Sequence, residues 1–309
     1  MFSGQGSQYF HMGEALFERN RVFREWMLRL DEVARRECGQ SVVAAIYGSA
    51  DKAETFNRTL LTHPAIVMVE YALAQSLMDA GVMPDMTFGA SLGSFTAAAV
   101  AGFIDVEDVL VAAIRQAAAF EARCAPGALL AVFATPTLFA ERVLSDHSEF
   151  AGGGFASHFT VACKCERVPE IEAALRARNL EYQRLPVSFA FHSRWIDEAQ
   201  RPFQSFMDSL TLEPGQIPLM CCAHAALLEE LPDDFLWCAV RRRIRVQEAV
   251  ARLERTGPHR YIDAGPSGML ATSLKYLLAA GSASTVHAVL TPYGRDEHNL
   301  AAVAVAARR

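Results

Sequence analysis

The sequence contains no apolar run that approaches the roughly 20 residues of a membrane span. Met1 to Gln5 also show neither the charged nor the apolar segment of a secretory signal, so we expect a cytoplasmic protein with no membrane partner. The seven cysteines are odd in number and never spaced as C-x-x-C, which favours reduced thiols over a disulfide framework or a zinc ribbon.

Several motifs that hold metals or nucleotides are also missing. The sequence has no H-E-x-x-H, no G-x-x-x-x-G-K-[ST] and no G-x-G-x-x-G, and Gly4-Gln5-Gly6 matches only a fragment of the last. We therefore expect no metal and no cofactor. The net charge of −6 argues against nucleic acid as the main partner, and 51% hydrophobic with 21% charged residues is typical of an ordinary globular protein.

The sequence does contain a candidate nucleophile elbow. G-x-S-x-G occupies residues 89–93, between the end of a short buried strand at 86–88 and a tightly packed helix at 94–100. This arrangement lifts a serine hydroxyl, here that of Ser91, out of the sheet, and the backbone N–H of Leu92 then faces a developing oxyanion. Because glycine and serine are common in loops, an ordinary glycine turn is the alternative.

A serine needs a base to act as a nucleophile at neutral pH. Among nine histidines, His192 is the best candidate, because it lies where the predicted strand 182–191 ends and a loop begins. A histidine that serves only as a satisfied polar group is the alternative.

Residues 127–190 predict an alternation of strands and helices. The expected strands are 129–133, 158–163 and 182–191, the expected helices are 136–146 and 168–179, and 149–154 is an expected loop. A further short strand would make this segment a small ferredoxin-like unit. The residues on either side of it indicate mixed α/β structure.

Two further helices flank the elbow. Thr62 is predicted to cap the first, with Pro64 tolerated in its first turn and a buried, almost wholly apolar run at 65–80. Asp105 begins the second, which runs to about residue 124. Later in the chain, a helix is expected over 197–210.

Four ordered motifs give the sequence a family resemblance. They are Phe2-Ser-Gly-Gln-Gly-Ser-Gln8, Gly89-Ala-Ser-Leu-Gly93, Phe189-Ala-Phe-His-Ser193 and Ile262-Asp-Ala-Gly-Pro266. Together they resemble the malonyl-CoA:acyl carrier protein transacylases and the acyltransferase domains of polyketide synthases. The resemblance implies an α/β fold: an α/β-hydrolase-like large domain (1–126 and 191–309) with an inserted ferredoxin-like small domain (127–190).

The resemblance also implies roles for particular residues. Ser91 would be the nucleophile and His192 its base, working through an acyl-serine ester. The backbone N–H groups of Gln5 and Leu92 would form the oxyanion hole. A main-chain carbonyl, at a position that falls near Ala239, would orient the histidine. The implied partner is an acyl carrier protein, with acyl-CoA as a second donor, and the implied state is a monomer.

Three positions near the elbow and the histidine depart from the family pattern. Ala90 and Ser94 stand where the family usually has His and Glu on either side of Ser-Leu-Gly. Phe189 stands where malonyl-selective members usually have His, and it makes that wall of the acyl pocket apolar. We expect Ala90 and Phe189 to contribute to acyl selectivity.

The arginine that binds the malonyl carboxylate in this family is replaced as well. A count without gaps from Ser91 places Gln116 at its position, whereas a shift of one residue would place Arg115 there. Neighbours on a helix point about 100° apart, so both cannot serve. A neutral amide cannot pair with a carboxylate as arginine does, so Gln116 predicts a preference for acyl groups without a carboxylate, acetyl or longer.

These departures resemble one branch of the family, the free-standing acyl hydrolases that clear stalled acyl groups from carrier proteins in polyketide biosynthesis. We therefore expect a proofreading thioester hydrolase. An acyl or malonyl transferase and a non-catalytic carrier-protein docking module are the alternatives. A basic cluster would dock an acidic carrier protein, or would form ordinary ion pairs at a solvated helix start; it comprises Arg241, Arg242, Arg243 and Arg245.

Overall fold

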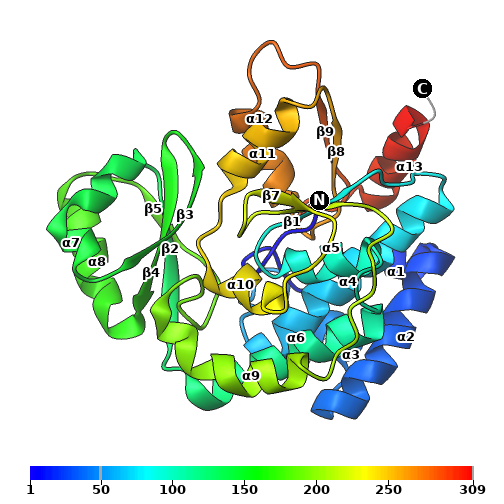
Figure 1. Cartoon of the computed structure of the whole chain (residues 1–309), viewed down its shortest axis with the longest axis horizontal. Coiled ribbons are helices and arrows are strands. Elements are labelled where there is room, and N and C mark those ends of the chain that lie inside the picture. The colour runs from blue at the N-terminus through cyan, green and yellow to red at the C-terminus, as the bar shows by residue number, and fades with distance from the viewer. Residues whose placement is uncertain (49–50, 308–309) are drawn as a thin grey trace.

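The computed structural model describes residues 1–48 and 51–307, which form a large α/β part and a smaller part with its own sheet (Figure 1). The large part begins with α1 (Glu14–Arg19), α2 (Arg21–Cys38), α3 (Val42–Ile46), α4 (Thr59–Asp79), β1 (Thr87–Gly89), α5 (Gly93–Val100) and α6 (Val106–Arg123). The smaller part contains β2 (Gly127–Val132), η1 (Pro136–Ala140), α7 (Arg142–Ser145), β3 (Glu149–Phe155), β4 (His158–Lys164), η2 (Cys165–Arg167), α8 (Val168–Ala177) and β5 (Tyr182–Arg184).

The chain then returns to the large part. Its remaining elements are η3 (Arg194–Ala199), α9 (Gln200–Met207), β6 (Leu219–Cys221), β7 (Ala226–Leu228), α10 (Phe235–Arg241), α11 (Val246–Glu254), β8 (Arg260–Asp263), α12 (Met269–Leu277), β9 (Thr285–Ala288) and α13 (Asp296–Ala307). Across the described ranges, no helix is both long enough and apolar enough to cross a membrane.

The smaller part is a four-stranded antiparallel sheet with the strand order β3-β4-β2-β5. Helices follow its first and third strands, and α7 and α8 lie on its outer side (Figure 1). Because side chains alternate along a strand, Ala128, Leu130 and Val132 of β2 are buried together with Ile171 and Leu175 of α8. This is the ferredoxin-like arrangement that the sequence indicates. The domain boundaries themselves stay a prediction.

The expected loop at 149–154 is wrong, because this segment is most of strand β3. It pairs with β4 through an irregular register that shifts near Gly152. Gly152 also bridges to Ile244, whose carbonyl oxygen would lie 2.7 Å from an added Cβ. Glycine is thus needed because a second backbone passes close to the strand, a recurrent reason for glycine within sheets.

Three other predicted elements differ in length. The predicted strand 182–191 ends at Arg184, and the rest of it returns the chain to the large part. The predicted helix 197–210 is divided into η3 and α9, and the predicted helix 136–146 into η1 and α7.

The first two residues join the two short sheets of the large part. In these sheets β1 pairs in parallel with β6, and β8 in parallel with β9. Phe2 donates its N–H to the carbonyl of Phe88 (2.8 Å) and accepts from the N–H of Ala90 (3.1 Å). On the other side, the amino group of Met1 donates to the carbonyl of Ile262 (2.7 Å). The loop that follows Phe2 is therefore held beside the elbow.

Helix α4 begins at Thr59, so the predicted cap at Thr62 is wrong. The N–H of Leu60, in the first turn, donates to the carboxylate of Glu121 on α6 (2.9 Å). A neighbouring helix thus satisfies an amide that a local cap would otherwise serve. Thr62 lies inside the helix, and its hydroxyl oxygen accepts a hydrogen bond from the side chain of Gln5 (2.6 Å).

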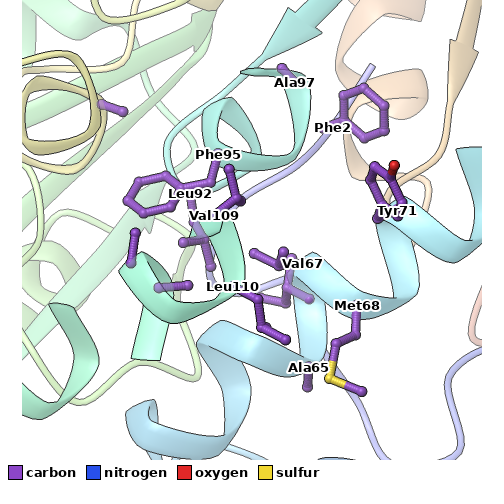
Figure 2. Packing of buried hydrophobic residues seen from close by; sticks show 14 of the residues in the cluster. Phe2, Ala65, Val67, Met68, Tyr71, Leu92, Phe95, Ala97, Val109 and Leu110 are labelled. Carbon is purple, nitrogen blue, oxygen red and sulfur yellow. The ribbon is translucent and has the colours of Figure 1, made fainter. Parts of the chain in front are cut away.

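The main hydrophobic core supports the elbow from behind. Figure 2 shows Leu92 and Phe95 close to Val109 and Leu110 of α6 and Val67 of α4. All five are fully buried. Interiors packed in this way transmit strain rather than yield to it, so the elbow is held in a fixed geometry.

Candidate active site

Ser91 occupies a strained position at the tip of the elbow. Its φ angle is 55°, in the left-handed region that residues with a side chain seldom adopt. An added Cβ on Gly93 would lie 2.2 Å from the carbonyl oxygen of Phe2, and one on Gly4 would lie 2.6 Å from Cβ of Ser91. The glycines therefore allow the first loop of the chain to touch the elbow, which is the geometry that a nucleophilic serine requires.

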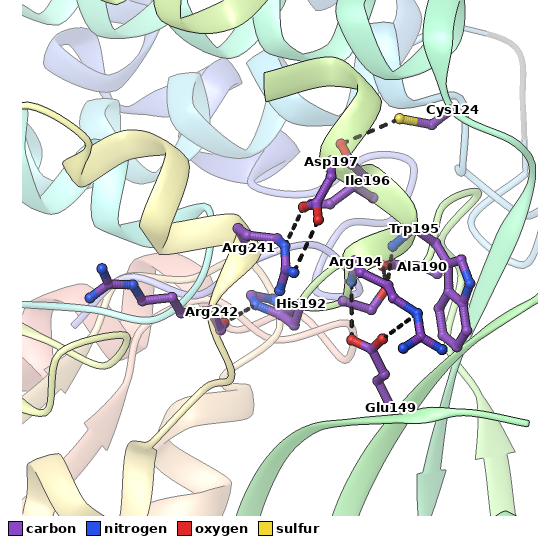
Figure 3. A network of polar contacts seen from close by, with 11 residues as sticks. Cys124, Glu149, Ala190, His192, Arg194, Trp195, Ile196, Asp197, Arg241 and Arg242 are labelled. Carbon is purple, nitrogen blue, oxygen red and sulfur yellow. Dashed lines mark hydrogen bonds and ion pairs between the residues drawn. The ribbon is translucent and has the colours of Figure 1, made fainter. Parts of the chain in front are cut away.

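His192 links Ser91 to the end of helix α10. Oγ of Ser91 lies 2.8 Å from Nε2 of His192, and Nδ1 of His192 lies 2.7 Å from the carbonyl oxygen of Arg242 (Figure 3). The backbone N–H of His192 donates to the carbonyl of Val240 (2.9 Å). Carbonyls at a helix end lack partners within the helix and carry partial negative charge. A proton on Nδ1 leaves Nε2 free to accept the proton of the serine hydroxyl.

The carbonyl that faces the histidine is that of Arg242, so the predicted position near Ala239 is wrong. Ala239 lies inside α10, a helix that was not predicted from the sequence. Arg242 is the residue after the helix end, where extended backbone (φ −77°, ψ 154°) turns its carbonyl away from the helix. The signal for α10 was the apolar run 235–240 directly after Asp234.

Burial keeps the imidazole of His192 uncharged. Desolvation lowers the pKa of His192 to about 4, helped by the positive charge of Arg241 and opposed by the hydrogen bond to the carbonyl of Arg242. The ring is therefore neutral at pH 7, which is the form that can take a proton.

Two backbone N–H groups are available next to Ser91. Within residues 1–48 and 51–307, the amides of Gln5 and Leu92 donate to no other group. Leu92 directly follows Ser91 at the start of α5, and Gln5 follows Gly4, which touches Ser91. The structure thus brings both predicted oxyanion-hole residues to the serine.

Gln116 points into the interior of the protein, whereas Arg115 points to its surface. The side chain of Gln116 is completely buried, and neither its amide oxygen nor its amide nitrogen has a partner among the described groups. Arg115 is more than half exposed and donates to the carboxylate of Glu37 (2.8 Å). The gap-free count therefore places a buried residue at the position of the family's carboxylate-binding arginine. The count shifted by one residue places a surface residue there.

Phe189 belongs to an aromatic wall, whereas Ala90 does not. The ring centroid of Phe189 lies 5.9 Å from that of Phe120 and 6.2 Å from that of Phe191. Ala90 is buried in a separate cluster that includes Met220. The structure thus places Phe189 near Phe191, the residue before His192, and places Ala90 away from this aromatic wall. Their roles in selectivity stay predictions.

Every arginine of the basic cluster has an acidic partner. Figure 3 shows Arg241 against Asp197. Ion pairs between exposed groups contribute little, roughly 0–1 kcal/mol each, so such arginines remain available to another acidic surface. These ion pairs agree with the alternative of ordinary ion pairs at a solvated helix start. Docking of a carrier protein on the cluster stays a prediction. The pairs are Arg241 with Asp197, Arg242 with Asp234 (3.7 Å), Arg243 with Glu248 (3.5 Å) and Arg245 with Glu248.

The comparisons with known proteins agree with this geometry. The family model of the acyl transferase domain matches residues 1–308. The chain belongs to the acyl transferase family. It is 39% identical over 302 residues to the polyketide biosynthesis acyltransferase homolog BaeD of Bacillus velezensis, covering 97% of this chain and 93% of that protein. It is 38% identical over 307 residues to the homolog PksD of Bacillus subtilis, with the same coverage.

A solved structure confirms the predicted fold of this member of the acyl transferase family. It is a loading acyltransferase from the avermectin modular polyketide synthase, with a TM-score of 0.90 and 23% identity over 100% of this chain and 98% of that one. At this identity the likeness shows the fold alone. The sequence resemblance to the family is confirmed by the family match and the curated relatives.

One buried polar contact next to the candidate site was not predicted from the sequence. The buried carboxyl of Glu70 accepts from the backbone N–H of Ser3 (2.7 Å) and from the hydroxyl of Thr96 (2.9 Å). Burial raises the pKa of Glu70 well above its ordinary value, and these hydrogen bonds only partly oppose the rise. Glu70 thus ties the loop of Gln5 to the elbow helix. The available signal was an acid, Glu70, in the middle of the otherwise apolar run 65–74.

A sizeable cavity among the described residues lies away from the serine. It has a volume of about 400 Å³ and opens between β1 and β8, where its lining includes Met86, Thr87 and Tyr261. Neither Ser91 nor His192 lines it. The candidate active site is therefore identified by its polar geometry rather than by this cavity.

Proposed function

We propose that this acyl transferase-family protein is a hydrolase that removes acyl groups without a carboxylate from acyl carrier protein thioesters, as a proofreading step in polyketide biosynthesis. Two observations carry the proposal: Gln116 is neutral and completely buried, and Oγ of Ser91 lies 2.8 Å from Nε2 of His192. The pair supplies a nucleophile and a base, and Gln116 supplies no charge for a carboxylate.

Acylation follows from the positions of the polar groups. Oγ of Ser91 attacks the thioester carbonyl while Nε2 of His192 takes the hydroxyl proton. The negative charge that develops on the carbonyl oxygen is stabilised by the free N–H groups of Gln5 and Leu92. The C–S bond then breaks, and His192 gives its proton to the departing pantetheine sulfur, leaving an acyl ester on Ser91.

Release repeats the same steps with water. Nε2 of His192 takes a proton from a water molecule, whose oxygen attacks the ester carbonyl, and the proton then returns to the departing Oγ of Ser91. The products are a free carboxylic acid and the unmodified serine. A pantetheine thiol in place of water would give a transferase.

The transferase is the second candidate, because both curated relatives are called acyltransferase homologs. A third, non-catalytic docking module, is disfavoured by the hydrogen bond between Ser91 and His192. One experiment tests all three candidates. Carrier protein is loaded separately with acetyl, butyryl or malonyl groups and incubated with the enzyme and with an unloaded carrier protein of different mass. The intact masses of both carrier proteins and of the enzyme are then measured.

A hydrolase empties the acetyl and butyryl carriers, releases free acid and leaves the malonyl carrier loaded. Appearance of the acyl group on the second carrier protein would contradict hydrolysis and support transfer. Persistence of every load, with no mass increase on the enzyme, would instead support the docking module.

The pH dependence of acylation follows from the lowered pKa of His192. Below that pKa the ring is protonated and cannot take the serine proton, so the rate falls tenfold per unit as pH decreases. We expect the acidic limb of kcat/KM for an acyl-pantetheine donor near pH 4, where the pKa lies, and not near the ordinary histidine value of 6.5. Arg241→Gln removes a positive charge and should move the limb to higher pH. A wild-type limb at 6.5 would show that His192 is not desolvated.

A further inference from the structure

Four buried polar atoms without a well-formed hydrogen bond lie between helices α4 and α6. They belong to two completely buried side chains, His63 on α4 and Gln116 on α6. Within the part of the chain that the structure describes, neither amide atom of Gln116 has a hydrogen-bond partner, and the backbone of Ala113 approaches the ring of His63 only outside ordinary hydrogen-bond geometry. Buried polar groups are normally paired, so two such residues together indicate that another molecule supplies the partners.

His63 and Gln116 share one seam between the two helices. The ring of His63 lies near the backbone of Ala113, and its centroid is 6.0 Å from that of Phe120. Gln116 comes three residues after Ala113 and four before Phe120 on the same helix. Residues at these spacings lie on one helix face, so Gln116 lies on the face that His63 meets.

The seam adjoins the reacting groups. Thr62, next to His63, accepts a hydrogen bond from the side chain of Gln5, whose backbone N–H lies in the predicted oxyanion hole. On its other side, the ring of His63 lies 5.6 Å from that of Phe191, the residue before His192. An acyl chain on Ser91 that extends along the aromatic wall would therefore reach these polar atoms.

We propose that His63 and Gln116 form a neutral polar subsite that binds an uncharged hydrogen-bonding group on the acyl chain, a hydroxyl or a keto oxygen. The proposal deepens the proposed function and rests on it. A neutral imidazole offers one donor and one acceptor, and an amide offers both, which suits a hydroxyl that gives and takes hydrogen bonds. Burial lowers the pKa of His63 to about 3, so the ring brings no positive charge to attract a carboxylate at pH 7.

The test compares acyl-pantetheine donors of equal chain length, namely butyryl and the two enantiomers of 3-hydroxybutyryl. For each donor, intact-mass measurement gives the rate at which acyl-Ser91 forms. Wild-type protein should acylate with at least one hydroxylated donor about tenfold faster than with butyryl, which corresponds to one hydrogen bond. His63→Phe and Gln116→Met, which keep the bulk but lose the polar atoms, should each bring this ratio close to one. His63→Gln should retain it.

A matched control is His158→Phe, which changes a histidine that also lies between aromatic rings, those of Phe133 and Phe155, in the smaller part of the molecule. Its ratio should equal that of the wild type. The absence of a preference in the wild type, or a ratio unchanged in both His63→Phe and Gln116→Met, overturns the subsite. Because acylation is measured before release, an acyl-Ser91 that persists in water would refute the hydrolase and leave the subsite standing.

Discussion

Replacement of Ser91 by alanine should reduce the rate at which acyl groups are released from carrier protein by at least about 10⁴-fold, because the acyl-serine ester can no longer form. The intact mass of the variant should also stay constant with every acyl donor, whereas the wild type gains the mass of one acyl group. The substitution removes one oxygen from a residue that is nearly buried, so folding should not be impaired. Both quantities come from one mass-spectrometric time course.

The chain offers a matched control for this variant in the helix that follows the elbow. Ser94 lies three residues further on and is completely buried, and its hydroxyl makes only a weak contact, with the thiol of Cys221. Ser94→Ala makes the same chemical change and should retain near wild-type release. Turnover by Ser91→Ala, or an equal loss in Ser94→Ala, would show that Ser91 is not the nucleophile.

The elbow could be predicted from sequence because its determinants are local. A strand end, a turn and a helix start lie within residues 86–100, and the glycines that the turn requires are part of the motif. The pairing of Ser91 with His192 spans 101 positions, and only two signals related the residues: a predicted strand end before His192, which the structure places at Arg184 instead, and the family resemblance. The order of the four motifs carried that resemblance, and the predicted fold followed from it.

The parts that failed depend on contacts between distant segments. A glycine-rich run looks like a loop until Ile244 is known to pass beside Gly152. The carbonyl that orients His192 belongs to Arg242, and its position depends on where α10 ends, which was not predicted. Gln116 could be distinguished from Arg115 only when the structure showed which of the two faces the interior.

Replacement of Gln116 by arginine should reverse the acyl preference of the site. The ratio of malonyl to acetyl acylation of Ser91 is expected to rise by about 100-fold, because a guanidinium pairs with the carboxylate and otherwise remains a buried, unpaired charge. The same unpaired charge should lower the free energy of unfolding of the free protein. The ratio is measured by intact mass with malonyl-CoA and acetyl-CoA as competing donors.

Two further variants make the interpretation of that ratio specific. Gln116→Met has similar length without charge, so it should not favour malonyl, and any rise there would point to shape rather than to ion pairing. Arg115→Gln removes the neighbouring arginine, which lies at the surface against Glu37, and should leave the ratio unchanged. A fall in malonyl acylation in Arg115→Gln, together with no rise in Gln116→Arg, would place the carboxylate-binding position at residue 115. In that case the main argument for a hydrolase of uncharged acyl groups would be lost, since the site would then hold the charge that a malonyl transferase needs.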